Sequence, residues 1–246
     1  MAKPKKPKIL VWDLEFFASK NYNNQLKIYP GYLLVFACQE LGKPKVTVIS
    51  KRVFGGSTPT DDELLVRTIA PHLRDVDMHI FQYGWKTDFK FMQTRLLYHG
   101  LRALPEPPVY VDTCQLAQRK LALKSNSLES LARFFKLDEQ KMPINEEQWH
   151  LAFAGHVPTM KLIEKRCASD VRLTGEVYKK LLELCDNHPS LYPSDPEEGP
   201  SCGACGETMV RDGTRATRAK GHRQRYRCTC CGTHRDLPVP KTKKGE

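Results

Sequence analysis

Two Cys-x-x-Cys pairs near the C-terminus constrain the fold of this chain more than any other feature. The first pair is Cys202 and Cys205, and the second is Cys228 and Cys231. Each pair brings two thiolates to one side of a tight turn, and two such turns make a tetrahedral four-sulfur site for one structural Zn²⁺ ion. So short a segment with few large apolar side chains needs such a metal in order to fold.

Other ligands remain open at this site. Cys230 is a spare thiol within the second pair, and His222 and His234 lie on either side of it. Cys228 and Cys231, the outer two of the three cysteines in this segment, are preferred because they repeat the spacing of the first pair. The segment resembles the zinc ribbons of nucleic-acid enzymes, in which a basic aromatic strand such as residues 225–227 precedes the second pair.

Positive charge gathers at both ends of the chain, whose formal net charge is +11. Residues 201–246 hold eleven Lys and Arg against four Asp and Glu, and residues 1–8 hold four Lys. Basic ends attract a polyanion. Arg225, Tyr226 and Arg227 are therefore candidate contacts to a phosphate backbone and a stacked base. A structural or protein-binding ribbon is the alternative, and the charge favours nucleic acid.

No segment of the sequence indicates a membrane protein. Neither an apolar run of about 18 residues nor the apolar stretch of a secretory signal is present, so the expected location is the cytoplasm. Four single cysteines are scattered along the chain before the ribbon, at positions 38, 114, 167 and 185. This arrangement is typical of buried free thiols in cytoplasmic proteins.

Hydrophobic periodicity predicts an α/β domain that begins with three strands and continues with strands alternating with helices. That order indicates a mixed β-sheet flanked by helices. The expected strands are 8–12, 32–38, 45–50, 78–83 and 109–111, and the expected helices are 61–74 with a Thr60 cap, 86–98, 127–135 with a Ser127 cap, and 158–184. The predicted divisions are a basic tail 1–8, the α/β domain 9–186, a linker 187–200, the ribbon 201–236 and a basic tail 237–246.

Four acidic residues occupy positions that favour a common site. Asp13 and Glu15 are two apart on the first strand, so their side chains share a face. Asp88 lies at the head of a helix that follows a strand and a glycine turn, and Asp170 lies inside the last helix. Carboxylates suit Mg²⁺ or Mn²⁺. Two such ions about 4 Å apart would stabilise the attacking and leaving oxygens of a phosphoryl displacement.

The order of these acids resembles the DEDD (DnaQ-like) superfamily of 3′-to-5′ exonucleases over residues 9–184. The matching motifs are Asp13-x-Glu15, Asp88-Phe89, Asp170-Val171, and between them Asp112-Thr113 and the Ser-Leu-x-x-Leu-Ala stretch at 127–132. The resemblance implies a ribonuclease-H-like fold in which Asp13, Glu15, Asp88 and Asp170 are the catalytic metal ligands. It also implies a nucleic-acid substrate, for which DNA is expected over RNA.

Three positions depart from the family pattern. The family has a Tyr four residues, or a His five residues, before the last Asp, where this chain has Arg166 and Lys165. Neither inherits the role of orienting the attacking water, because arginine has no lone pair and stays protonated, and lysine is ordinarily protonated. Both are instead candidate contacts to the scissile phosphate. Tyr83 replaces a frequent Asn, and His156 is the nearest alternative base, although an ordinary capping histidine is favoured.

The sequence therefore predicts a two-metal nuclease, specifically a 3′-to-5′ exonuclease on DNA with a zinc ribbon that increases substrate affinity. A non-catalytic nucleic-acid-binding module with the same fold is an alternative because Arg166 stands in place of the family tyrosine. A ribonuclease-H-like structure-specific endonuclease is another.

Overall fold

The computed structural model of this chain describes residues 6–18, 31–54, 59–106, 108–186, 188–192, 199–217 and 221–239. These fall into two compact units that divide between Tyr178 and Lys179, so the predicted boundaries at 186/187 and 200/201 stay predictions. Much of the two predicted basic tails and residues 187 and 193–198 of the predicted linker lie outside the described residues. Among the helices described, none combines the length and apolar character needed to cross a membrane.

A mixed five-stranded sheet forms the centre of the first unit, as described. Its strands are β1 (Ile9–Phe17), β2 (Tyr32–Glu40), β3 (Val46–Ser50), β4 (Met78–Phe81) and β5 (Tyr110–Asp112). They lie in the order β3-β2-β1-β4-β5, with β2 antiparallel to both β1 and β3 and with β4 parallel to both β1 and β5. The central β1 has a paired neighbour on each side, and the predicted mixed α/β class is confirmed.

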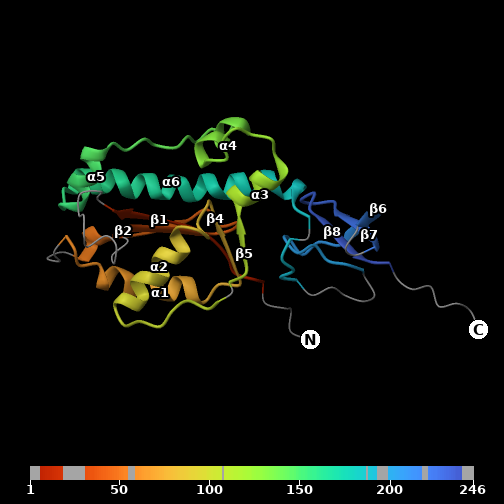
Figure 1. The fold of residues 1–246 in the computed structure, drawn as a ribbon, viewed down its shortest axis with the longest axis horizontal. Helices are drawn as coiled ribbons and strands as arrows, with labels where there is room; N and C mark the ends of the chain where they lie inside the picture. Colours follow the sequence, from red (N-terminus) through yellow and green to blue (C-terminus); the bar gives the residue numbers. More distant parts are fainter. Residues whose placement is uncertain are drawn as a thin grey trace, which may run out of the picture. The chain divides into compact units, whose positions relative to one another are not determined.

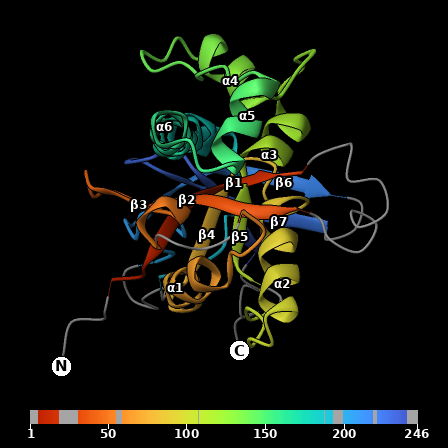
Figure 2. The same cartoon turned by 90° about the vertical axis from the view of Figure 1, so that its left-hand side faces the viewer.

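Helices cover both faces of this sheet. Their bounds are α1 (Glu63–Arg74), α2 (Asp88–Tyr98), α3 (Thr113–Lys120), α4 (Leu128–Phe134), α5 (Glu146–Phe153) and α6 (Val157–Leu181), with short 3₁₀ turns at Lys51–Phe54 and Leu182–Leu184. Helices α1 and α2 lie on one side of the sheet, and the long α6 runs along the other side (Figures 1 and 2). The sheet therefore sits between two helical layers.

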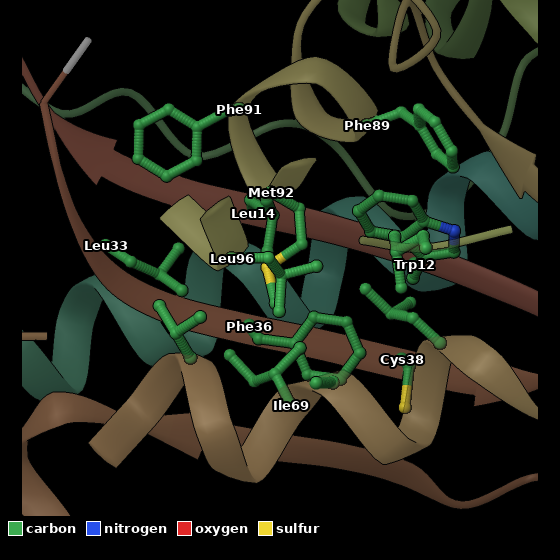
Figure 3. Close-up of a cluster of buried hydrophobic side chains, with 14 of the residues drawn as sticks. Trp12, Leu14, Leu33, Phe36, Cys38, Ile69, Phe89, Phe91, Met92 and Leu96 are labelled. Atoms are coloured by element: carbon green, nitrogen blue, oxygen red, sulfur yellow. The ribbon is translucent and has the colours of Figure 1, made fainter. Parts of the chain in front are cut away.

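The pleat of β1 separates an apolar face from an acidic one. Trp12 and Leu14 belong to the buried hydrophobic core beneath α1 and α2, which also contains Ile69 of α1 and Met92 of α2 (Figure 3). Successive side chains alternate across a strand, so the intervening residue Asp13 turns toward the α6 side. The alternation predicted from the sequence thus places the acids away from the apolar core.

Strand β1 is longer than expected, because it continues beyond Trp12 to Phe17. Its last two residues are held by aromatic partners from other elements. Phe16 stacks on Phe91 with ring centroids 4.1 Å apart, and Phe17 stacks on Phe153 at 4.3 Å. Asp13 and Glu15 consequently lie within the strand.

The predicted Thr60 cap is wrong, because α1 begins at Glu63 and Asp62 precedes it. The buried carboxylate of Asp62 does not cap the helix. It accepts hydrogen bonds from Nε of Arg95 at 3.0 Å and from the N–H of Leu33 at 2.8 Å. Tertiary partners therefore determine the role of this acid. By contrast, the Ser127 cap is confirmed, since its side chain accepts the N–H of Ser130 at the start of α4.

The second unit contains an antiparallel sheet, in the order β6-β7-β8, beside a cluster of four cysteines. Its strands are β6 (Met209–Thr217), β7 (Gly221–Cys228) and β8 (His234–Pro238). Part of the predicted linker packs against the first cysteine turn. A Cβ on Gly203 would lie 2.6 Å from the carbonyl oxygen of Pro189 and 2.9 Å from that of His188, so only glycine fits there.

Candidate functional site

Three of the four predicted acids converge on one point. Asp13 and Glu15 from β1 and Asp170 from α6 each offer a carboxylate oxygen, and these oxygens lie within 4.8 Å of one another. The register of β1 and β2 shifts between Glu15 and Phe16, which marks a β-bulge beside this cluster. A bulge re-aims the side chains next to it. The three residues are called the carboxylate cluster below.

Asp88 lies beside the carboxylate cluster, in the first turn of α2. Its Oδ1 accepts the backbone N–H of Leu14 at 3.1 Å, and its Oδ2 accepts the hydroxyl of Thr87 at 2.5 Å. Asp88 is near enough to be the largest of the charges that raise the pKa of Asp13, after the effect of burial. The predicted fourth acid is therefore adjacent to the cluster, and its carboxylate is already held by two donors.

Asp112, another buried acid, fixes the turn that leads to Asp88. Its carboxylate accepts the N–H of Tyr83 at 2.9 Å and the N–H of Trp85 at 3.3 Å. Tyr83 has a φ of 62°, a left-handed conformation that a bulky residue adopts only when its surroundings enforce it. This turn also ends β4 at Phe81, two residues earlier than predicted. Asp112 thus positions the turn before Asp88.

Two cationic side chains reach the carboxylate cluster. Nε of Arg166 lies 2.9 Å from Oε1 of Glu15 and 3.7 Å from Oδ2 of Asp170, and Nζ of Lys141 lies 3.4 Å from the same Asp170 oxygen. The Arg166 guanidinium also lies 5.6 Å from the ring centroid of Trp149. The sequence prediction included Arg166 but missed Lys141 and Trp149, which belong to a segment without a recognisable motif.

The other two candidates, Lys165 on α6 and His156 just before it, lie away from the carboxylate cluster. Lys165 is exposed. His156, just before the helix, shares a 2.7 Å hydrogen bond between its Nδ1 and the hydroxyl of Thr159. With a rise of 1.5 Å per residue, Asp170 lies about 20 Å further along the axis. The hypothesis of His156 as a base is therefore wrong, and the capping interpretation agrees with the contact.

Burial and mutual repulsion raise the pKa of Asp88 and of the three acids of the carboxylate cluster. Burial is the largest cause for each of them. It raises the pKa of Glu15 to about 7 against the opposing charge of Arg166, and that of Asp88 to about 6 against the hydrogen bond from Thr87. The pKa of Asp13 is held well above its ordinary value by burial and then by its acidic neighbours. Such under-compensated carboxylates favour a bound cation.

Stability is expected to depend on pH in a direction that these shifts determine. A folded-state pKa of about 7 for Glu15 and about 6 for Asp88, above the ordinary values of 4.5 and 3.8, means that the folded chain binds protons more tightly than the unfolded chain. Acidification through this range therefore stabilises the fold. Without added divalent ions, we expect the Tm at pH 5.5 to exceed that at pH 7.5 by roughly 5 °C.

Tryptophan fluorescence measures this transition in the first unit alone, because Trp12, Trp85 and Trp149 all precede residue 179. The control is Glu15→Gln, which removes the carboxyl group whose pKa is raised to about 7. In this variant the Tm should depend less steeply on pH. A Tm that falls on acidification would contradict the raised pKa values of these acids. So would a Glu15→Gln variant whose Tm changes with pH as steeply as that of the wild type.

The four predicted zinc ligands form a second cluster. Sγ of Cys202 lies 3.5 Å from Sγ of Cys231, and Sγ of Cys205 lies 3.5 Å from Sγ of Cys228. A tetrahedral Zn²⁺ with bonds of about 2.3 Å spaces its sulfurs at about 3.8 Å, so the four thiols fit this ion. Cys230 is exposed and lies outside the group.

The two histidines considered as ligands also lie outside the four-cysteine group as described. His234 instead lies 3.2 Å from Asp212, and His222 is exposed on β7. The choice of the outer cysteines of the second pair therefore agrees with the structure.

The basic residues of β7 divide between the two faces of the ribbon sheet. Arg225 is engaged by an acid, since its Nη2 lies 2.8 Å from Oδ1 of Asp186. Tyr226, one residue later, points to the opposite face, and the strand register places Arg211 of β6 and Arg235 of β8 directly beside it. The sequence prediction grouped Arg225 with Tyr226, but the alternation places their side chains on opposite faces. The sequence prediction also did not include Arg235 of β8.

Comparisons with known proteins bear on the fold. No model of a protein family matches the chain, and no curated protein matches it either. Among solved structures, the chain is similar to the family B DNA polymerase from the hyperthermophilic archaeon Pyrobaculum calidifontis, with a TM-score of 0.56 and 18% sequence identity. The likeness covers 75% of this chain and 26% of the polymerase, so the chain corresponds to about a quarter of that protein's length.

Proposed function

We propose that this chain is a divalent-metal-dependent nuclease with a ribonuclease-H-like core. The observation that carries the proposal is the convergence of Asp13 and Glu15 with Asp170, which lies more than 150 positions later in the sequence. The mixed sheet between two helical layers supports it. So does the likeness to a family B DNA polymerase, because such polymerases contain an exonuclease domain of this fold.

The donor set fits Mg²⁺ or Mn²⁺. Carboxylate oxygens are the ligands that these hard cations prefer. Oε1 of Glu15 and Oδ1 of Asp170 are buried and have no hydrogen-bond partner among the described residues, so each has a lone pair to offer. When bound, a divalent ion lowers the pKa of a water molecule and stabilises negative charge on phosphate oxygens. Asp13, Glu15 and Asp170 would hold it.

The neighbouring residues would bind and orient the substrate. Arg166 presents a guanidinium, which matches the geometry of a phosphate group, beside the carboxylate cluster. Asp88, fixed by the N–H of Leu14 and the hydroxyl of Thr87, places a fourth carboxyl group next to Asp13. We propose the 3′ end as the point of attack, as the DEDD resemblance implies, and we propose DNA as the preferred substrate.

The ribbon would contribute affinity through the face that carries Tyr226. An aromatic ring flanked by Arg211 and Arg235 offers a base-stacking surface between two guanidinium groups, although Nη1 of Arg235 also donates to the carbonyl oxygen of Ser201 at 3.0 Å. Arg227 is exposed on the other face and offers a further phosphate contact. Arg225 is already paired with Asp186, so its proposed contribution is smaller.

A non-catalytic nucleic-acid-binding module is the second candidate. It is favoured by one specific observation, namely that Arg166 and Lys141 lie within ion-pair distance of Glu15 and Asp170. In that case the two side chains would neutralise the acids in place of metal, and the chain would bind nucleic acid without cutting it.

A 5′-labelled single-stranded DNA oligonucleotide incubated with the chain and Mn²⁺ separates these functions. We expect a ladder of products that shortens from the 3′ end, with slower cleavage of the matching RNA. A single discrete product would indicate an endonuclease. Intact DNA that nevertheless shifts in a gel would identify the binding module and would reject the nuclease proposal.

A further inference from the structure

The carboxylate cluster contains fixed positive charge of its own. Arg166 lies one helical turn before Asp170, at i and i+4, so both side chains emerge on the same face of α6. The Arg166 side chain is 14% exposed and the Glu15 side chain that it approaches is 9% exposed. An arginine stays protonated at any pH at which the protein folds. Its charge is therefore permanently present beside the carboxylate cluster.

The contact between Arg166 and Glu15 depends on charge and not on a directed hydrogen bond. Nε of Arg166 and Oε1 of Glu15 are 2.9 Å apart, yet neither atom has a hydrogen-bond partner among the described residues. The Trp149 ring, 5.6 Å from the guanidinium, supports the arginine without using any of its N–H donors. The oxygen of Glu15 therefore remains available to a metal ion.

The balance of charge sets how many ions the carboxylate cluster accommodates. Asp13, Glu15, Asp88 and Asp170 carry four negative charges when ionised, and Arg166 and Lys141 supply two positive ones. One divalent ion neutralises the net charge of these six side chains. The nearby buried carboxylate of Asp112 is compensated separately, by the N–H groups of Tyr83 and Trp85. A second divalent ion would leave an excess of positive charge in a buried site, where uncompensated charge is costly.

We infer that this cluster binds a single divalent ion and that Arg166, assisted by Lys141, takes the place of the second ion expected from the sequence. The inference rests on one part of the proposed function, namely that Asp13, Glu15 and Asp170 bind a divalent ion. The guanidinium would then stabilise phosphate charge by hydrogen bonding, the role that a second ion has in a two-metal site.

Electron paramagnetic resonance of the unbound Mn²⁺ signal measures how many ions the zinc-loaded full chain binds. We expect one Mn²⁺ per wild-type chain and two per chain in the Arg166→Gln/Lys141→Gln double variant. Lys165→Gln is the matched control, because this exposed lysine is the neighbour of Arg166, and it should still bind one ion. Asp170→Asn should lose most of the binding, which assigns the ion to the cluster.

Two Mn²⁺ ions in the wild type, none in the wild type, or an unchanged single ion in a folded double variant would each overturn the inference. If the double variant does not fold, the wild-type count decides the question alone. The outcome is separate from that of the cleavage assay. A wild-type chain that binds one Mn²⁺ without cleaving DNA would reject the nuclease proposal and leave the single-ion site standing.

Discussion

Asp13→Asn is expected to reduce Mn²⁺-dependent cleavage of the labelled oligonucleotide by at least about 100-fold. Asp13 contributes one of the three convergent carboxylates, and an amide of the same size removes its charge with little change in shape. Substituting a residue that merely supports a metal ligand costs about 10- to 100-fold, so loss of a ligand should cost no less. Initial rates at saturating oligonucleotide measure the effect.

Loss of activity in Asp13→Asn should not come from loss of the fold. The carboxylate of Asp13 is repelled by Asp88, Glu15 and Asp170, so its removal should leave the metal-free Tm unchanged or higher. Gel-shift affinity for the same oligonucleotide should persist, since the proposed ribbon contacts are untouched. Asp138→Asn, at an exposed acid of the same unit, is the control and should cleave normally. Full activity in Asp13→Asn would exclude the proposed site.

The part of the site that could be predicted from sequence depends on local geometry. A spacing of two on a strand places Asp13 and Glu15 on one face wherever the strand runs. Asp112 likewise lies at the end of β5, where its side chain caps α3 by accepting the N–H of Gln115. The prediction that Asp170 joins these acids rests on the order of the motifs, and therefore on the family resemblance.

The residues that sequence analysis missed act through contacts between distant segments. Lys141 reaches Asp170 from a segment with neither periodicity nor a motif, so nothing in its neighbours marks it. Helix α5 was also missed, although Asn145 and Gln148 form a capping box at its start, because only its residue Ala152 is fully buried and an apolar face is therefore hard to recognise. A sequence pattern therefore predicts which residues are buried better than it predicts which distant residues they contact.

The same distinction explains the misassigned cap at Thr60. Acids next to a helix start are ordinarily capping residues, and the sequence offers several there. The Asp62 carboxylate instead pairs with Arg95, 33 positions later, and both side chains are fully buried. A buried charge needs hydrogen-bond or ion-pair partners, and only the fold shows which residues supply them.

Removing zinc is expected to unfold the ribbon while the first unit stays folded. The free energy of Zn²⁺ binding to small four-ligand domains is about 10 to 16 kcal/mol, and for such domains it is in effect the folding free energy. Few large apolar side chains are buried in the second unit apart from those around its cysteines. Its three strands should therefore lose their pairing when a strong chelator removes the ion.

Two measurements follow the two units separately. Trypsin should cut rapidly at Arg223 and Arg225 in β7 once zinc is removed, because unpaired strands expose these bonds. Tryptophan fluorescence should not change, since the tryptophans all belong to the first unit. Native mass spectrometry should find one zinc per wild-type chain.

The cysteines of the ribbon provide a matched pair of variants. Cys228→Ser removes a thiol that lies 3.5 Å from Cys205 and should abolish zinc binding, with trypsin sensitivity equal to that of the chelated chain. Cys230→Ser, two residues away at an exposed position, should retain zinc and resistance. Loss of zinc in Cys230→Ser would mean that the ligand set is misassigned, and retention of an intact, zinc-bound ribbon in Cys228→Ser would show that the metal is not what holds these strands together.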